Sequence, residues 1–171
     1  MAAVLSASPA HKKRLLTVFG TRPEALKCFP VARAAQQHEG FLPQICNTAQ
    51  HREMVDQVVA LTGLKIDYDL DVMRPGQTLA GVTTRVMERM TGVLDQAEPD
   101  IVVVQGDTTT AMAAALSAFY RGIPVAHVEA GLRTHDLAQP CPEEMNRCVI
   151  DVFADPLFAP TTAARANLLS E

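Results

Sequence analysis

The sequence lacks the features that mark several large classes of protein. It has no dense Lys/Arg cluster, and 15 Lys and Arg residues against 19 Asp and Glu give a formal net charge of −4. This balance argues against a nucleic-acid or anionic-membrane partner, because both require a basic surface. The longest purely aliphatic block, residues 101–104, is far shorter than the ~20 residues of a membrane span. In residues 1–14 the positive charges follow the apolar part, which is the reverse of a secretory signal, so we expect a cytoplasmic protein.

Several short motifs of well-known sites are also missing. The sequence contains no Gly-x-Gly-x-x-Gly fingerprint, no Gly-Lys-Ser/Thr phosphate loop and no Gly-x-Ser-x-Gly nucleophile elbow. Its four cysteines are widely spaced and form no Cys-x-x-Cys pair. We therefore expect structural or incidental thiols, with no metal centre and no disulfide. The residues concerned are Cys28, Cys46, Cys141 and Cys148.

What the sequence does contain is a repeated alternation of short β-rich runs and helical patterns. At 171 residues and 48% hydrophobic content, it suits one domain with a well-buried core. The alternation predicts an α/β fold, with a parallel sheet and helices on both faces. Strands are expected at 15–19, 44–47, 101–104, 125–128 and 157–159, and a short extended piece around 70–72. Helices are expected at 23–37, around 54–61, at 79–97, 108–120 and 143–153, and from 161 onward.

Polar residues follow several of these strands, where ligands bind in open parallel sheets. They are Arg22, Glu24, Lys27, Gln50, His51, Asp107, Glu129, Arg133 and Glu143. Glu129 follows Asp107 after 22 residues, which fits one strand–helix–strand crossover, so we expect the two carboxylates to converge on one pocket. An alternative interpretation makes Asp107 the N-cap of the helix that follows it, and the two roles are compatible.

Three further features each have a functional and a structural interpretation. The turn Gly20-Thr-Arg-Pro-Glu24 offers helix N-terminal amides beside Arg22 and Lys27, which suits an anion such as a diphosphate. The acidic pair at 143–144 suits a catalytic site but also the first turn of a helix. His127, at the end of a buried strand, is expected to be a hydrogen-bonded core histidine rather than a ligand.

Five segments together resemble a known family. They are VFGTRPEA at 18–25, TAQHREM at 48–54, QGDTTT at 105–110, HVEAGLRT at 127–134 and PEEMNR at 142–147. In this order they resemble the non-hydrolysing UDP-N-acetylglucosamine 2-epimerases, from about residue 14 to the end. The resemblance covers the N-terminal half of such an enzyme. It implies a flexible tail at 1–13 and a Rossmann-like domain at 14–171. This domain would be the first of two in a glycosyltransferase-B-like enzyme, with the C-terminal UDP-binding domain absent from this chain.

The resemblance also implies a reaction and a set of residues. The family interconverts UDP-N-acetylglucosamine and UDP-N-acetylmannosamine by eliminating UDP to give 2-acetamidoglucal and adding it back. The motifs imply Asp107, Glu129 and Glu143 as catalytic carboxylates. They imply Arg22, Lys27, Arg133 and Arg147 for substrate binding. A regulatory UDP-N-acetylglucosamine site is implied at Gln50, His51, Gln77 and Glu143. The reaction needs no metal or redox cofactor, and the family forms cytoplasmic homodimers.

Two alternatives stay open. The domain could hold a nucleotide sugar, or a partner subunit, without catalysis. It could also be a hydrolysing epimerase or a glycosyltransferase relative of similar fold. In every case the 171-residue chain, without a second domain, is expected to show little or no epimerase activity alone.

Overall fold

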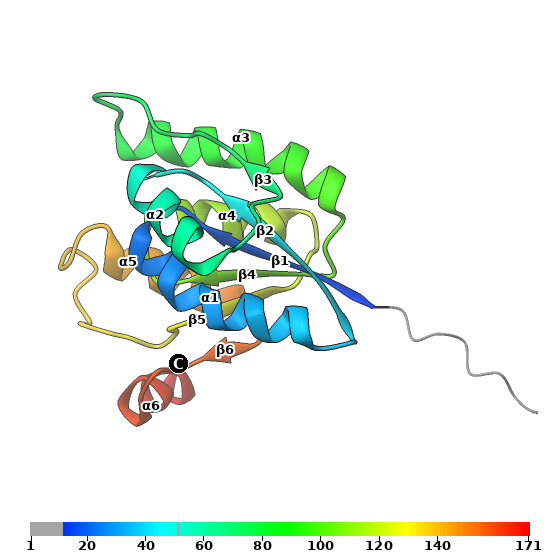
Figure 1. Ribbon diagram of the computed structural model, residues 1–171. Coiled ribbons are helices and arrows are strands. Elements are labelled where there is room, and N and C mark those ends of the chain that lie inside the picture. The colour runs from blue at the N-terminus through cyan, green and yellow to red at the C-terminus, as the bar shows by residue number, and fades with distance from the viewer. Residues whose placement is uncertain (1–11, 51) are drawn as a thin grey trace, which may run out of the picture.

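In the computed structural model, which describes residues 12–50 and 52–171, one parallel sheet forms the centre of the molecule (Figure 1). Its six described strands lie in the order β3-β2-β1-β4-β5-β6. Their bounds are β1 Lys13–Phe19, β2 Phe41–Asn47, β3 Tyr68–Asp69, β4 Ile101–Gln105, β5 Val125–Val128 and β6 Leu157–Phe158. The helices are α1 Arg22–Gln37, α2 Arg52–Thr62, α3 Leu79–Ala97, α4 Thr109–Tyr120, α5 Glu143–Phe153 and α6 Thr162–Ser170. The α/β alternation is confirmed.

Two local features differ from the sequence interpretation. The third strand lies at Tyr68–Asp69, just before the extended piece expected around 70–72, where the amides of Leu70 and Val72 bond to carbonyls at the end of β2. The N-cap of α4 is Thr108, whose Oγ1 accepts the amide of Ala111 at 3.0 Å, and not Asp107. A threonine hydroxyl at this position satisfies the free helix amide as well as a carboxylate does. The side chain of Asp107 is therefore available for another role.

Helices cover both faces of the sheet because the strand residues alternate in direction (Figure 1). Leu16 and Val18 of β1 belong to the core under α3, α4 and α5. Phe19 of β1 and Ile45 of β2 belong to the core under α1 and α2. On α4 a run of alanines is fully buried, and these small side chains let the helix approach the sheet closely.

The strand order reverses between β1 and β4, so the loops after these two strands diverge from a common point. This is the topological switch point, where open α/β sheets bind their ligands. The loop after β1 begins at Gly20, where an added Cβ would lie 1.8 Å from Thr48 Oγ1. Only glycine fits there, so the loops after β1 and β2 can pack directly against each other. Arg22 follows β1, Asp107 follows β4 and Glu129 follows β5 at the carboxyl ends of these strands.

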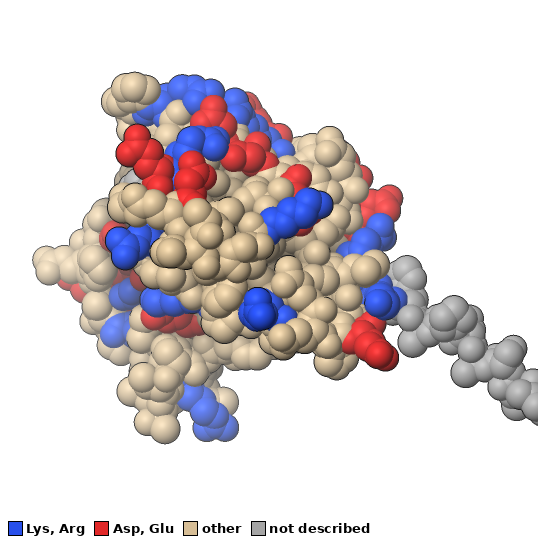
Figure 2. All heavy atoms as spheres, viewed as in Figure 1, with Lys and Arg blue, Asp and Glu red and all other residues tan. Residues whose placement is uncertain are grey.

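The surface matches the composition. Figure 2 shows acidic and basic side chains interspersed over the visible face, without a continuous basic patch. Within residues 12–50 and 52–171, no helix has the length and apolar character needed to cross a membrane. Strand β1 starts at Lys13. The expected flexible tail at 1–13 lies almost entirely outside the described residues.

Candidate active site

The turn after β1 is closed by its own glutamate. Glu24 Oε2 accepts the amides of Gly20 at 2.7 Å and Thr21 at 2.8 Å, and Oε1 accepts the hydroxyl of Thr108 at 2.6 Å. Glu24 is only 3% exposed, and this burial raises the pKa of its carboxyl group. Two amides of the turn that we expected to face a diphosphate, those of Gly20 and Thr21, are therefore already satisfied. Arg22 is exposed, and among the described residues it has no hydrogen-bond or ion-pair partner.

Lys27 and Glu129 meet at the carboxyl edge of the sheet. Lys27 Nζ lies 2.7 and 2.6 Å from the two carboxylate oxygens of Glu129. Gln105, the last residue of β4, donates its side-chain amide to the same carboxylate. Glu129 follows β5 directly and has a left-handed backbone with φ 71°, a conformation that non-glycine residues adopt rarely and mostly at functional sites. Its side chain is 25% exposed, so it remains accessible to a ligand.

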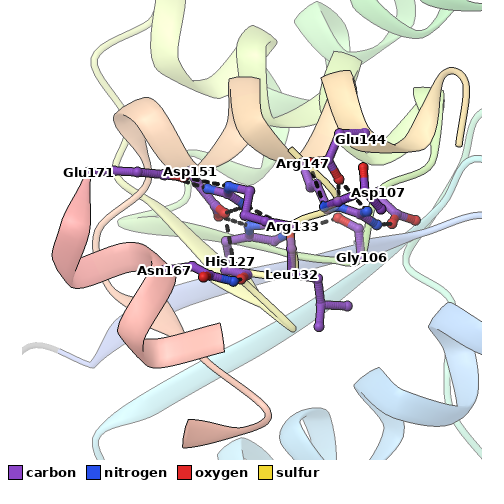
Figure 3. A network of polar contacts seen from close by, with 12 residues as sticks. Gly106, Asp107, His127, Leu132, Arg133, Glu144, Arg147, Asp151, Asn167 and Glu171 are labelled. Atoms are coloured by element: carbon purple, nitrogen blue, oxygen red, sulfur yellow. Dashed lines mark hydrogen bonds and ion pairs between the residues drawn. The ribbon is translucent and has the colours of Figure 1, made fainter. Parts of the chain in front are cut away.

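Asp107 is held by α5. Arg147 Nη1 lies 2.7 Å from Asp107 Oδ2, and the side-chain amide of Asn146 donates to the Asp107 carbonyl at 2.8 Å. Arg147 also bonds to Glu144 through Nε, at 2.8 Å, and through Nη2. Figure 3 shows the Arg147 side chain between Glu144 and Asp107. The Arg147 side chain is 9% exposed and that of Asp107 28%, so Asp107, rather than Arg147, is open toward a ligand.

Of the acidic pair at 143–144, the second residue is buried. The Glu144 side chain is 1% exposed, and its Oε1 accepts the amides of Thr134 and His135 at 2.9 and 3.0 Å. Burial alone would raise the pKa of Glu144, but these amides and Arg147 lower it below its ordinary value. The spacing of Glu144 and Arg147, three residues apart in one helix, was the signal in the sequence for this pair. Glu143 is half-buried in the same first turn of α5.

Arg133 belongs to a second buried cluster. Its Nη1 lies 2.8 Å from Asp151 Oδ2, and its Nη2 lies 2.7 Å from Glu171 Oε2. The Arg133 side chain is only 2% exposed. Asp151 also bonds to Nδ1 of His127, which is fully buried, so the expectation of a core histidine is confirmed. Figure 3 shows Asp151, His127 and Glu171 of this cluster to the left of the group formed by Arg147, Glu144 and Asp107.

Comparison with known proteins identifies the family. Residues 33–171 match the family model described as UDP-N-acetylglucosamine 2-epimerase. The chain is 52% identical over 158 residues to the UDP-N-acetylglucosamine 2-epimerase of Neisseria meningitidis, and 53% identical over 158 residues to that of Yersinia pestis. The chain belongs to the UDP-N-acetylglucosamine 2-epimerase family. Each alignment covers 92% of this chain but only 42% of the relative, so the chain spans less than half the length of these curated epimerases.

Solved epimerase structures share the fold. The N. meningitidis enzyme bound to UDP-N-acetylglucosamine superposes with a TM-score of 0.89 at 52% identity, over 92% of this chain and 42% of that one. The Methanocaldococcus jannaschii epimerase in complex with UDP-N-acetylglucosamine and UDP gives 0.85 at 39% identity, over 92% and 43%. MurG from Acinetobacter baumannii gives 0.60 at 18% identity, over 85% and 40%, which shows the fold alone. The predicted Rossmann-like class is thus confirmed.

Of the candidate regulatory residues, Gln50 follows β2, Gln77 precedes α3 and Glu143 begins α5. Gln50 accepts a hydrogen bond from Thr110 at 2.8 Å. Gln77 precedes α3 and bonds to Arg85 and Met73. Among the described residues no hydrogen bond joins Gln50 to Gln77, and His51 lies outside those residues. Their regulatory role stays a prediction.

Residues 12–50 and 52–171 contain neither a disulfide nor a cluster of metal-ligating side chains. All four cysteines are free, and burial raises the pKa of Cys46 to about 12, which leaves it a poor nucleophile. In the part of the chain that the structure describes, no group of three or more His, Cys, Asp or Glu side chains could hold a metal ion.

Proposed function

We propose that this chain supplies the carboxylates of a non-hydrolysing UDP-N-acetylglucosamine 2-epimerase. The single observation that carries the proposal is the placement of Asp107 and Glu129. They follow the adjacent strands β4 and β5 at the switch edge, are partly exposed there, and are each paired with a cation. Partly open, fixed carboxylates at a ligand-binding edge suit proton transfer to and from a sugar ring.

The chemistry explains why two or more carboxylates are required. Inverting C2 needs one group to remove its proton on one face and another to return a proton on the other face. On elimination, the C2–H electrons form the C1=C2 bond of 2-acetamidoglucal while the C1–O electrons leave with UDP. Re-addition reverses these steps after protonation from the opposite face. Asp107, Glu129 and Glu143 are the proposed acid–base groups, and a carboxylate also stabilises the positive charge that develops at C1.

The departing diphosphate needs positive charge. Of the four implied substrate-binding residues, Arg22 is the one that is exposed and unpaired among the described residues, and it is proposed to supply this charge. Lys27 is half-exposed beside Glu129 and is proposed to act there as well. Arg133 and Arg147, by contrast, are buried in ion pairs, which favours an orienting role over direct substrate contact. We propose that the rest of the UDP site is supplied by the region that corresponds to the remaining length of the relatives, outside the part that this chain matches.

The test is product analysis on the protein expressed from the complete gene. Incubation with UDP-N-acetylglucosamine in ²H₂O should give UDP-N-acetylmannosamine with deuterium at C2. Free N-acetylmannosamine would instead indicate a hydrolysing enzyme. Binding of the nucleotide sugar without turnover would indicate a silent binding domain. The 171-residue polypeptide alone serves as the matched comparison and is expected to show little or no turnover.

We also propose that the protein is a cytoplasmic homodimer, because the chain belongs to this family. Light scattering of the complete gene product is expected to give twice the mass of one chain, and a monomeric mass would contradict this part.

A further inference from the structure

His127 connects two of the loops that carry the candidate carboxylates. It lies on β5 opposite Val104 of β4, with 0% exposure. Its Nε2 lies 2.7 Å from the Gly106 carbonyl, and its Nδ1 lies 2.5 Å from Asp151 Oδ1. A carbonyl oxygen only accepts hydrogen bonds, so Nε2 carries a proton and donates a hydrogen bond to the Gly106 carbonyl.

This hydrogen bond constrains the backbone at Asp107. The Gly106 carbonyl and the Asp107 amide belong to one planar peptide unit, so holding the carbonyl holds the orientation of the amide and of the following Cα. Gly106 has φ +71°, a conformation open to glycine, and its peptide would otherwise rotate at little cost. Its own amide bonds to the Val128 carbonyl at 3.0 Å. The loop is thus fixed to β5 through both its backbone and His127.

Asp151 extends the connection to the loop after β5. Its Oδ2 accepts the Gly131 amide at 3.0 Å and Arg133 Nη1 at 2.8 Å. Gly131 comes two residues after Glu129. One buried aspartate on α5 therefore orients the ring that holds the Asp107 loop and also bonds to the loop that follows Glu129 (Figure 3).

We propose that His127, oriented by Asp151, is a positioning residue that sets the geometry of the Asp107 carboxylate through the Gly106 peptide. The link from geometry to turnover rests on the proposed epimerase function. His127 itself is fully buried and does not touch substrate. Its effect is expected on the rate of the chemical step, because a displacement of about 1 Å in an acid–base group can cost about a hundredfold in rate.

Two variants separate the role of each ring nitrogen. In His127→Gln, the side-chain amide reaches the position of Nε2 and keeps the bond to Gly106. In His127→Asn, the amide reaches the position of Nδ1 and keeps the bond to Asp151 only. Both variants lose the ring, and His127→Asn, one methylene shorter than His127→Gln, also leaves the larger cavity. Urea unfolding of both variants therefore measures lost packing separately. A merely structural role predicts that the local resonances and kcat follow this loss of stability and not the ring nitrogen that is replaced.

The first readout needs no enzyme activity. In the 171-residue chain, His127→Asn is expected to shift the NMR resonances of the Gly106 carbonyl and the Asp107 amide, whereas His127→Gln leaves them close to wild type. In the unsubstituted chain, ¹⁵N-histidine and ¹³C-carbonyl labelling should reveal a coupling across the Nε2–Gly106 hydrogen bond. That measurement decides the matter even if a variant fails to fold, and absence of the coupling would overturn the proposal.

The second readout is turnover by the complete gene product. His127→Asn should lower kcat at least about tenfold with KM changed less than about twofold, and His127→Gln should stay within about threefold of wild type. Equal kcat and equal Asp107 resonances in the two variants would overturn the positioning role. If the unsubstituted protein lacks epimerase activity, the proposed function fails, while the NMR readout still decides whether His127 positions Asp107.

Discussion

Lys27 on α1 contacts both carboxylate oxygens of Glu129, which lies 102 residues further along the chain. The contact joins α1 to the loop after β5. In the sheet, β4 separates β1, which leads into α1, from β5. Both side chains keep part of their surface exposed. The pair therefore fixes a carboxylate at the ligand-binding edge without enclosing it.

Replacing Lys27 by methionine should lower epimerase turnover and leave stability almost unchanged. The pair is partly exposed, so solvent screens it and its loss should cost no more than about 1 kcal/mol of unfolding free energy. Turnover by the complete gene product and thermal unfolding are the two measurements. Lys13→Met is the control, because Lys13 forms a similar exposed pair with Asp100 at the start of β1. Equal loss of turnover in both variants would contradict a specific role for Lys27.

Replacing Asp107 by asparagine should reduce turnover about 10²-fold or more, the usual contribution of a positioned acid–base group. Arg147 keeps its bonds to Glu144 in this variant, so the fold should be retained, as circular dichroism would verify. A rate near that of the unsubstituted protein would remove Asp107 from the acid–base groups. The same assay applies to Glu129→Gln.

Substitution of the adjacent residues Glu143 and Glu144 should have different effects on stability and turnover. Glu144→Gln leaves the buried Arg147 with only one anionic partner and should cost about 3 kcal/mol of unfolding free energy, near the lower end for a broken buried pair. Glu143→Gln should change that free energy by about 0.5 kcal/mol or less and act on turnover instead. Urea unfolding of the 171-residue chain measures both. A larger loss of stability in Glu143→Gln than in Glu144→Gln would show that the roles are reversed.

The contribution of Glu144 to stability should depend on pH. Its pKa is lower in the folded chain than its ordinary value of 4.5, so the folded state favours the ionised form. This stabilisation is complete above pH 4.5 and is lost as the pH falls through the folded-state pKa. The difference in urea midpoint between the unsubstituted chain and Glu144→Gln should therefore be large at pH 7 and shrink below pH 4.5. A difference that grows on acidification would contradict the assigned direction.

Local pattern determined most of the fold. Three local features predicted helices and strands: the non-alternating run at β4, the three- and four-residue spacing of apolar residues in α3, and Pro23 at the start of α1. Each depends only on residues close together in the sequence. Strand β3 was not predicted because it pairs with β2 over only two residues, too few to leave a distinct pattern. That Asp107 and Glu129 follow neighbouring strands could be anticipated, since neighbouring parallel strands end at the same edge, whereas the meeting of the two carboxylates in one pocket stays a prediction.

By itself, then, the sequence determined the α/β alternation, the family and the stretch of chain in which the carboxylates lie. Only the tertiary structure decided what each charged group contacts. Glu24 accepts two of the turn amides that looked open to a diphosphate, Glu144 rather than Glu143 is buried with Arg147, and Arg133 pairs with Asp151. The physical reason is that such pairs depend on distances between segments far apart in the chain. Strand order and helix packing set those distances, and no local spacing encodes them.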